Sequence, residues 1–162
     1  MSHSAYLTVT GQRQGKIRGP VTLPGRKDSI RVYSGSHEIV SPRDAATGLP
    51  TGNRMHKPMT LVKEIDCSSP LLMNALVTNE NLNEVLLQFW QQDRAGRDVP
   101  YYTIRLLNAT ISGIRLVLTP ETLPDSILPA EREELTFTYR KIDWTWQQGG
   151  LSATDDWTYP VV

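Results

Sequence analysis

Few residues of this sequence have the types and spacing that chemistry at a site requires. The strongest candidate metal ligands are three histidines and the single cysteine, namely His3, His37, His56 and Cys67. They follow no zinc-type spacing, because neither a CxxC nor an HxxxH pattern occurs. A site assembled in space from scattered ligands stays open as an alternative. The pattern nevertheless favours a chain without a metal site and without a cofactor.

The candidate nucleophile and phosphate motifs are also incomplete. Serine and histidine are close together in Ser34-Gly35-Ser36-His37, but the GxSxG nucleophile elbow is absent. The segment Gly11–Lys16 resembles a phosphate-binding loop, yet it is one residue short, and Ile17 stands where Ser or Thr must hold magnesium. We interpret it as a turn. A carboxylate pair could come from Glu131, Glu133 and Glu134, but a charged strand edge that opposes aggregation is favoured. We predict no catalytic residues, and therefore no enzyme.

The totals indicate one ordinary globular domain. A chain of 162 residues can bury roughly 70% of its unfolded surface, so we expect residues 1–162 to form a single domain. One cysteine allows no intrachain disulfide. The first ten residues lack the apolar core of a signal peptide, and no apolar run is long enough to span a membrane. We expect the chain to be made in the cytoplasm and to contact no membrane. If it leaves the cell, it does so without an N-terminal signal.

The charges are balanced overall but distributed unevenly. Residues 1–59 hold nine Lys/Arg and three Asp/Glu, whereas residues 60–162 hold eight and fourteen. Such a division fits nucleic-acid binding, a basic face of one copy meeting an acidic face of the next, or two halves that interleave in one fold. Nucleic acid is disfavoured, because Tyr6 and Tyr33 are the only aromatic residues of the basic half.

Periodicity predicts a mainly β protein with one helix. Alternating or β-branched patterns predict strands over residues 5–10, 29–40, 60–66, 84–91, 101–107, 114–118 and 135–146. Residues 120–129 are expected to be a loop that contains prolines. Seven to nine strands of this kind form an antiparallel barrel or sandwich. The helix is expected to begin at Ser69 as N-cap with Pro70 at N1, and to place Leu72, Met73, Leu76 and Val77 on one side.

Two segments differ from the rest. Residues 41–58 are rich in proline and glycine and poor in large aliphatics, which indicates a long basic loop; structureless loops of this length are uncommon unless they are functional. The C-terminal segment holds three of the four tryptophans, Trp144, Trp146 and Trp157. The alternation of inward residues changes phase at Arg140-Lys141, which suggests a β-bulge or a crossing between sheets. No chemistry lies beside these tryptophans, so we interpret them as packing or assembly residues.

An ordered set of segments resembles the haemolysin-coregulated protein (Hcp) family, the inner-tube subunits of the type VI secretion system. The matching segments include Tyr6–Val9, Asp28–Val32, His37-Glu38, Thr51–Pro58, Lys63–Leu72, Tyr101–Leu106, Tyr139–Trp146, Gly149-Gly150 and Asp155–Trp157. Cys67 departs from the family pattern, which often shows a small polar or charged residue there.

The resemblance implies a β-barrel of two sheets with a short flanking α-helix. It implies a homohexameric ring, rings that stack into a tube, and export by a contractile sheath. Expected partners are a VgrG-type spike protein and small effector proteins in the lumen, which the tube carries and chaperones. A tail-tube protein of a phage or phage-like contractile particle is the alternative, because fold and assembly would be shared.

We expect residues 41–59 to reach a neighbouring subunit, because this segment is long and has no apolar core of its own. The candidate interface residues are Arg43, Asp44, Thr47, Leu49, Thr51, Arg54 and His56. A surface loop without contacts is the alternative. Trp144, Trp146 and Trp157 are expected to lie either in the core or at the seam with the next subunit.

Overall fold

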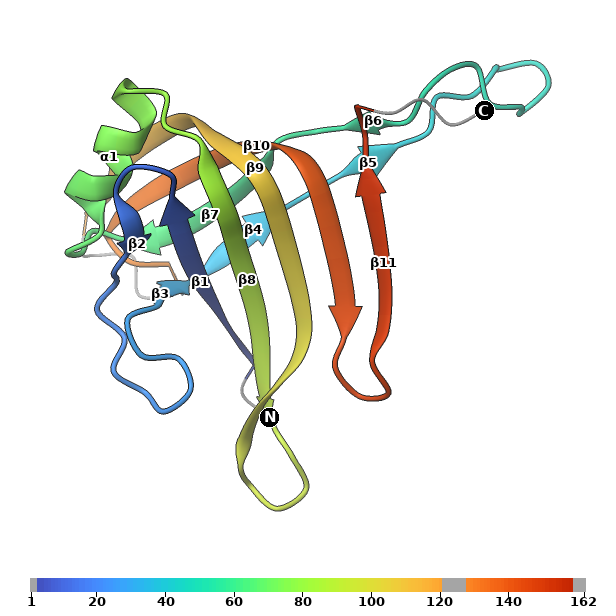
Figure 1. The fold of residues 1–162 in the computed structure, drawn as a ribbon. Helices are drawn as coiled ribbons and strands as arrows, with labels where there is room; N and C mark the ends of the chain where they lie inside the picture. Colours follow the sequence, from blue (N-terminus) through green and yellow to red (C-terminus); the bar gives the residue numbers. More distant parts are fainter. Residues whose placement is uncertain (1–2, 121–127, 159–162) are drawn as a thin grey trace.

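The protein is one strongly curved antiparallel sheet with a helix at one end and an arm that projects from it (Figure 1). The structure is a computed structural model that describes residues 3–120 and 128–158. The elements are β1 (Ser4–Gly11), β2 (Gly15–Ile17), β3 (Ile30–Val32), β4 (Ser34–Ser36), β5 (Ile39–Val40), β6 (Met55–His56), β7 (Met59–Glu64), α1 (Ser69–Val77), β8 (Leu82–Gln92), β9 (Asp98–Leu118), β10 (Glu131–Trp146) and β11 (Leu151–Asp156). The predicted mainly β, antiparallel class with one short helix is confirmed. The expected loop at residues 120–129 falls largely outside the described residues.

The main sheet has nine strands and rolls toward a barrel. Its order is β2-β1-β8-β9-β10-β7-β4, with β11 paired to β10 and β3 paired to β1. Since β3 pairs with β1 and the following β4 pairs with β7, the segment from Ile30 to Ser36 joins the two distant edges. Between them, the Tyr33 N–H donates to the Val62 carbonyl at 2.9 Å. The ladder is not continuous around the circle, so the expected barrel of two sheets is a single rolled sheet, and a separate ribbon of β5 and β6 lies beside it.

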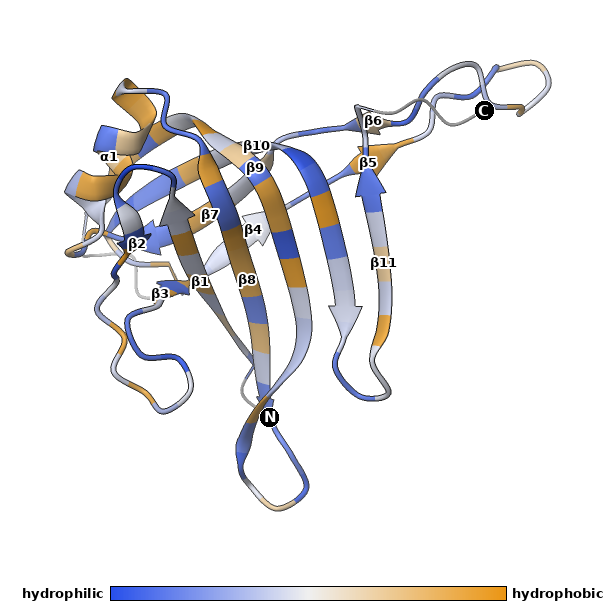
Figure 2. Cartoon of the chain, in the orientation of Figure 1, coloured by the Kyte–Doolittle hydropathy of each residue, from blue (hydrophilic) through white to orange (hydrophobic). Residues whose placement is uncertain are grey.

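The core follows from alternation along β1, β7, β8, β9 and β10. Apolar residues at every second position point inward, and Leu7, Leu106 and Phe137 are almost completely buried. Figure 2 shows the same alternation as orange and blue bands along these strands. The two strands predicted over residues 101–107 and 114–118 are one strand, β9, which continues past Gly113 and has 21 residues. Its last part leaves the core, because Leu116 and Leu118 are exposed.

The phase change predicted at Arg140-Lys141 is present. In β10, every second residue from Glu133 to Tyr139 is buried. The next buried residue is Ile142, three positions after Tyr139, so the alternation changes phase between them. The neighbouring strands change phase opposite this point, at Asn83 in β8 and Asn108 in β9. Asn108 has a φ of 52°, a value that asparagine tolerates better than most residues. Three strands therefore bend together, and the bend curls the sheet.

Helix α1 packs against the sheet with a narrower face than its sequence suggests. Leu72 and Ala75 are buried, whereas Met73 and Val77 are exposed. Part of the predicted apolar side was therefore wrong. The N-cap is Ser68, one residue before the predicted Ser69. The Ser69 hydroxyl instead accepts the Asp66 backbone N–H at 3.0 Å and donates to the carboxylate of Glu133.

A buried ion pair holds α1 to the sheet. The Lys63 ammonium donates to Glu133 Oε1 at 2.8 Å and to the Ser69 hydroxyl at 3.0 Å. It also lies 3.3 Å from Asp66 Oδ1, and the Lys63 side chain is completely buried. The expectation of a charged strand edge at Glu131, Glu133 and Glu134 was therefore wrong for Glu133. This carboxylate neutralises a buried lysine, because a buried charge without a partner would be too costly.

Residues 39–56 form the arm, and they are more ordered than the long loop that the sequence predicted. Strands β5 and β6 pair at its base, through Ile39 with His56 and Val40 with Met55. Farther out, Arg43 and Pro50 form an isolated antiparallel bridge. The arm is thus a β-ribbon with a turn at its end, and it extends away from the barrel beside β11 (Figure 1).

Candidate functional site: the arm and its root

The tip of the arm is a hydrogen-bonded turn that stands in solvent. Asp44 Oδ1 accepts the backbone N–H groups of Ala46 at 2.7 Å and Thr47 at 3.0 Å. The Asp44 N–H donates to the Leu49 carbonyl at 2.8 Å, and the Gly48 N–H donates to the Asp44 carbonyl at 2.8 Å. The Thr47 and Ala46 donors hold the pKa of the Asp44 carboxyl below its usual value. Local bonds alone therefore shape this turn.

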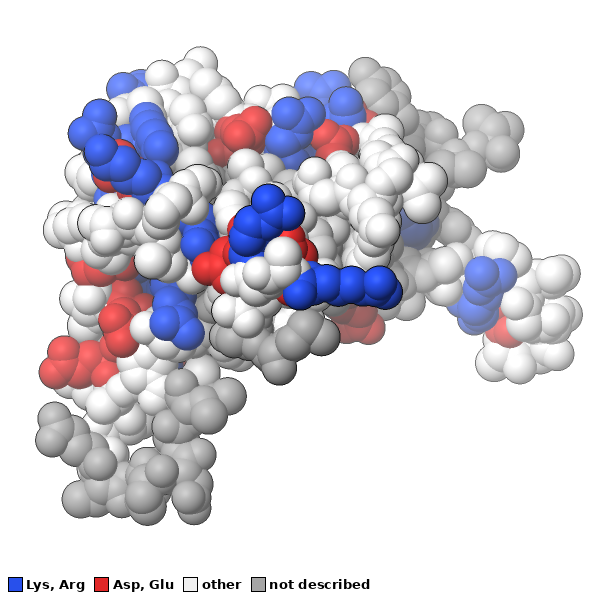
Figure 3. Space-filling view, turned by 90° about the horizontal axis from the view of Figure 1, so that it is seen from below, with Lys and Arg blue, Asp and Glu red and all other residues white. Residues whose placement is uncertain are grey.

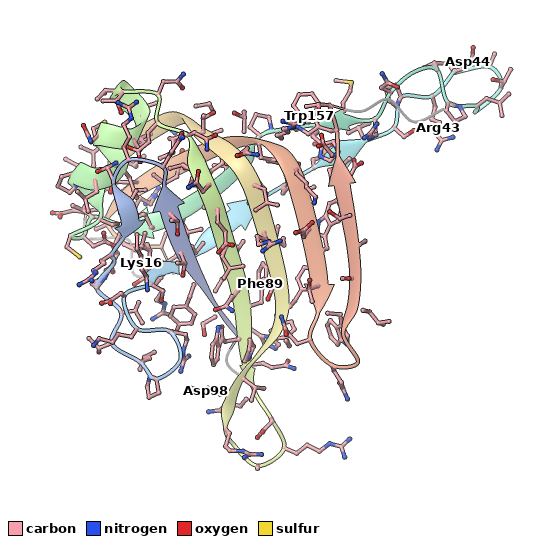
Figure 4. The ribbon with its side chains drawn as sticks, in the orientation of Figure 1. Lys16, Arg43, Asp44, Phe89, Asp98 and Trp157 are labelled. Carbon is pink, nitrogen blue, oxygen red and sulfur yellow. The ribbon has the colours of Figure 1, made fainter. Side chains whose placement is uncertain are left out.

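Side chains at the tip contribute almost nothing to the protein's own core. Every residue from 43 to 53 is exposed, and the Leu49 side chain is 64% exposed. Figure 4 places Arg43 and Asp44 at the far end of the arm, well separated from the barrel. Thr51 lies one residue beyond the bridge and donates its N–H to the Pro42 carbonyl at 3.0 Å. An ordered turn of this kind presents its side chains outward at low entropic cost.

The root of the arm is fixed to β11 by a charged cluster. Arg54 donates from Nε to Asp155 Oδ2 at 2.9 Å and from Nη2 to Asp155 Oδ1 at 2.8 Å. A further bond runs from Arg54 Nη2 to the Asp156 carbonyl at 2.9 Å. His56 Nε2 lies 2.7 Å from Asp155 Oδ2. The bonds from Arg54, the largest cause, and from His56 hold the pKa of Asp155 below its usual value.

A chain of hydrogen bonds continues from this cluster into the barrel wall. The Tyr139 hydroxyl lies 2.7 Å from His56 Nδ1 and 2.7 Å from His37 Nε2. The ionised carboxylate of Asp155 can only accept, so His56 Nε2 must donate to it. In neutral His56, Nδ1 then accepts the Tyr139 hydroxyl proton, and the Tyr139 oxygen accepts from His37 Nε2. His37, two residues before the arm, and His56, the last residue of the arm, are thereby both tied to Tyr139 of β10.

Burial adjusts the acid–base behaviour of this root. The pKa of His37 is lowered, first by burial and then by His56. The pKa of Tyr139 is raised, first by burial and then by Asp155. Both shifts favour the uncharged forms that the hydrogen-bond directions require. The root is therefore arranged to hold a geometry near neutral pH.

The three tryptophans of interest lie in three different environments. Trp157 belongs to the root: its ring stacks on His56 with centroids 6.0 Å apart, and its indole N–H donates to the Tyr139 carbonyl (Figure 4). Trp144 is partly buried against the core. Trp146 lies two residues farther along β10, is 41% exposed, and packs edge-on against Tyr101.

The structure thus divides the predicted interface residues into two groups. Arg43, Asp44, Thr47, Leu49 and Thr51 lie at the exposed end of the arm. Arg54 and His56 lie at the root, where they bind the same chain through Asp155, Asp156 and Tyr139. Sequence reasoning did not identify His37, Tyr139 and Asp155 as partners, since strand pairing alone brings them together. The only signal was the conspicuous Asp155-Asp156-Trp157 segment.

The charges of the two sequence halves interleave in the fold. Arg26 pairs with Asp98 at 3.2 Å and Arg54 pairs with Asp155 at 2.8 Å, so basic residues of the first half meet acidic residues of the second. Figure 3 shows positive and negative side chains beside one another on the underside. Among residues 3–120 and 128–158, no group of three or more His, Cys, Asp or Glu could hold a metal ion. No helix within those ranges is long and apolar enough to cross a membrane.

Comparisons with known proteins agree with one another. Residues 6–146 match the family model described as "Type VI secretion system effector, Hcp". The chain is 37% identical to the "Major exported protein" of Pseudomonas aeruginosa over 99% of both chains. Its fold is similar to a crystal structure of an Hcp protein, with a TM-score of 0.88, 28% identity, and coverage of 96% of this chain and 98% of the other. It is also similar to the secreted protein Hcp3 from Pseudomonas aeruginosa, with a TM-score of 0.78, 32% identity and coverage of 96% and 99%.

Proposed function

The chain belongs to the Hcp family of type VI secretion proteins, and on that premise we propose that it is a subunit of the inner tube of such a system. Residues 1–162 act as one tube domain. Six copies form a ring, and rings stack into a tube that the contractile sheath drives out of the cell. The chain waits in the cytoplasm before firing and is then exported with the tube.

The observation that carries this proposal is the arm. Its root is held by charge-assisted bonds to Asp155, yet its tip turn stands in solvent around Leu49. Local hydrogen bonds shape the tip, but its side chains are exposed and bury almost no surface against the barrel. A partner that receives the tip supplies the missing contacts, and in a homo-oligomer that partner is another copy.

Open sheet edges support ring formation. Within the described residues, β11 pairs only with β10, and β2 pairs only with β1. Strand edges carry unpaired backbone N–H and C=O groups that another strand can bind. Pairing between the edge of one copy and that of its neighbour makes the wall of a ring continuous. Because the two edges differ, such a contact is heterologous and closes into a ring when the rotation allows.

The remaining partners follow from this role. A VgrG-type spike protein caps the tube, and small effector proteins travel in its lumen, where the ring acts as their chaperone. The chain serves as a structural conduit and not as an enzyme.

An export assay tests this function. A tagged chain is expressed in its own host with the contractile sheath intact and in a matched strain without the sheath, and a cytoplasmic enzyme serves as the marker for lysis. We expect the chain in the culture medium only when the sheath is present. Equal amounts in both media, with no lysis marker, would contradict the proposal.

A further inference from the structure

The barrel has an open, mainly apolar mouth that no described residue of the single chain fills. A cavity of about 540 Å³ lies among β1, β3, β4, β7, β8 and β9. Its wall includes Ala5, Leu87, Phe89 and Ile104, and also Arg31 and the segment Ser34–His37 that leads to the root of the arm. We call this cavity the barrel mouth. Its volume is many times the roughly 30 Å³ that a water molecule occupies in liquid water, so it can take side chains of another protein.

A row of aromatic side chains begins at Phe89, which lines the barrel mouth, and leads away from it. Phe89 lies 6.3 Å from Tyr101, and Tyr101 lies 6.0 Å from Trp146, measured between ring centroids. His3, which also lines the cavity, packs edge-on against Tyr101. Trp146 is 41% exposed. Partly exposed aromatic residues beside an apolar cavity are the usual anchors of protein–protein interfaces.

The arm tip lies far from the barrel mouth, although the mouth itself extends along Ser34–His37 toward the root of the arm. Figure 1 places the N-terminal start of β1, which forms part of the mouth, at the bottom of the view and the arm at the top. Figure 4 shows Phe89 on the lower half of β8 and Asp44 at the end of the arm. The tip and the part of the mouth around Phe89 are therefore too far apart to meet within one chain. Between copies, they generate a head-to-tail contact that repeats by translation and builds a filament.

The tip has the chemistry that the barrel mouth requires. Leu49 is the large apolar residue at its end, 64% exposed. Asp44 is hydrogen-bonded to Leu49 through the backbone, so it approaches the mouth together with Leu49. Arg31, which stacks on Tyr33 at 4.8 Å, offers a positive charge to that carboxylate. Apolar contact and charge therefore point to the same pairing.

We propose that the arm tip of one copy inserts Leu49 into the barrel mouth of a copy in the next ring. This inference rests on the proposed tube function and adds the surface that receives the arm. The occupant of the cavity is a second copy of this chain, and the contact joins rings along the tube axis. Contacts within a ring are left to the sheet edges.

Site-directed disulfide formation tests the pairing directly. All variants carry Cys67→Ser, and one tagged copy carries Leu49→Cys. A second copy, with a different tag, carries Ser36→Cys or Ser4→Cys, two positions that line the mouth. The control copy carries Ser152→Cys on β11, which is exposed and lies outside the mouth. A disulfide requires Cα atoms roughly 4.4–6.8 Å apart, so cross-linking reports direct contact.

We expect the Leu49→Cys copy to cross-link with a mouth copy and not with the Ser152→Cys control. A second comparison uses Leu49→Asp, which should leave rings intact but abolish stacks of rings in sedimentation. The control is Val77→Asp on α1, where the side chain is also exposed, and rings of this variant should stack normally. Tubes in micrographs without any cross-link to the mouth would overturn this inference and leave the tube function standing. Absence of rings from the unmodified chain would overturn both.

Discussion

Substitution of Lys63 by methionine should destabilise the protein strongly, because it leaves Glu133 buried without its counter-charge. The Lys63 side chain is completely buried, that of Glu133 is 7% exposed, and the two charges are 2.8 Å apart. Removing one partner of such a pair costs about 3–5 kcal/mol. For a chain of this length, each kcal/mol lowers the midpoint of thermal unfolding by about 2–4 °C. We therefore expect a decrease of about 6–20 °C in thermal unfolding followed by circular dichroism.

A second substitution separates the lost pair from lost packing. Glu133→Leu in the same chain replaces the more deeply buried of the two carboxylates that face Lys63 by an apolar side chain, and such exchanges of whole pairs are often neutral or stabilising. The other carboxylate, Asp66, keeps its hydrogen bond from the Ser68 N–H at 2.8 Å. We expect the double variant to recover most of the stability that Lys63→Met loses. A Lys63→Met variant within about 1 kcal/mol of the original chain, or single effects that simply add in the double variant, would refute this reasoning.

Three further changes test the arm and its root. Deletion of Thr47–Gly52 should weaken stacking, and sedimentation that shows unchanged hexamers with unchanged stacks would exclude this segment as an interface. Because burial lowers the pKa of His37 from its usual 6.5, the unfolded chain binds the proton first. The contribution of neutral His37 to the free energy of unfolding is complete above pH 6.5 and is lost as pH falls through the folded pKa. Acidification should therefore lower the midpoint of thermal unfolding more in the original chain than in His37→Gln. An equal decrease of the midpoint with pH in both chains would argue against this. Asp155→Asn turns an acceptor of three bonds into a mixed donor and acceptor, so hydrogen exchange should become faster throughout residues 39–56, and protection equal to that of the original chain would contradict the role of the root.

Local sequence patterns predicted the parts of the fold that depend on neighbouring residues. The alternation in β1 and β8 and the serine–proline start of α1 are short-range signals, and they located these elements within a few residues. The phase change at Arg140-Lys141 was also visible, because it alters which residues of a single strand point inward. The bend that it marks crosses three strands. Its extent could not be predicted, because it depends on the strand pairing that places Asn83 and Asn108 opposite this point.

Features that depend on distant partners were missed or misjudged. Glu133 looks like a surface carboxylate until Lys63 is placed opposite it, and the two are 70 positions apart. Residues 41–58 seemed structureless because β6, the strand within them, has only two residues, and its partner β5 lies just before them. The bond that fixes the root joins Arg54 to Asp155, 101 positions away. Sequence reasoning therefore located the exposed arm but could not tell its tip from its root.

The central claim is that this chain assembles into the rings of a secretion tube, and electron microscopy of the purified protein tests it most directly. Negative-stain images at high protein concentration should show rings with a central hole and stacks of those rings. A monodisperse monomer at the same concentration, with folded barrel and intact arm, would contradict the claim.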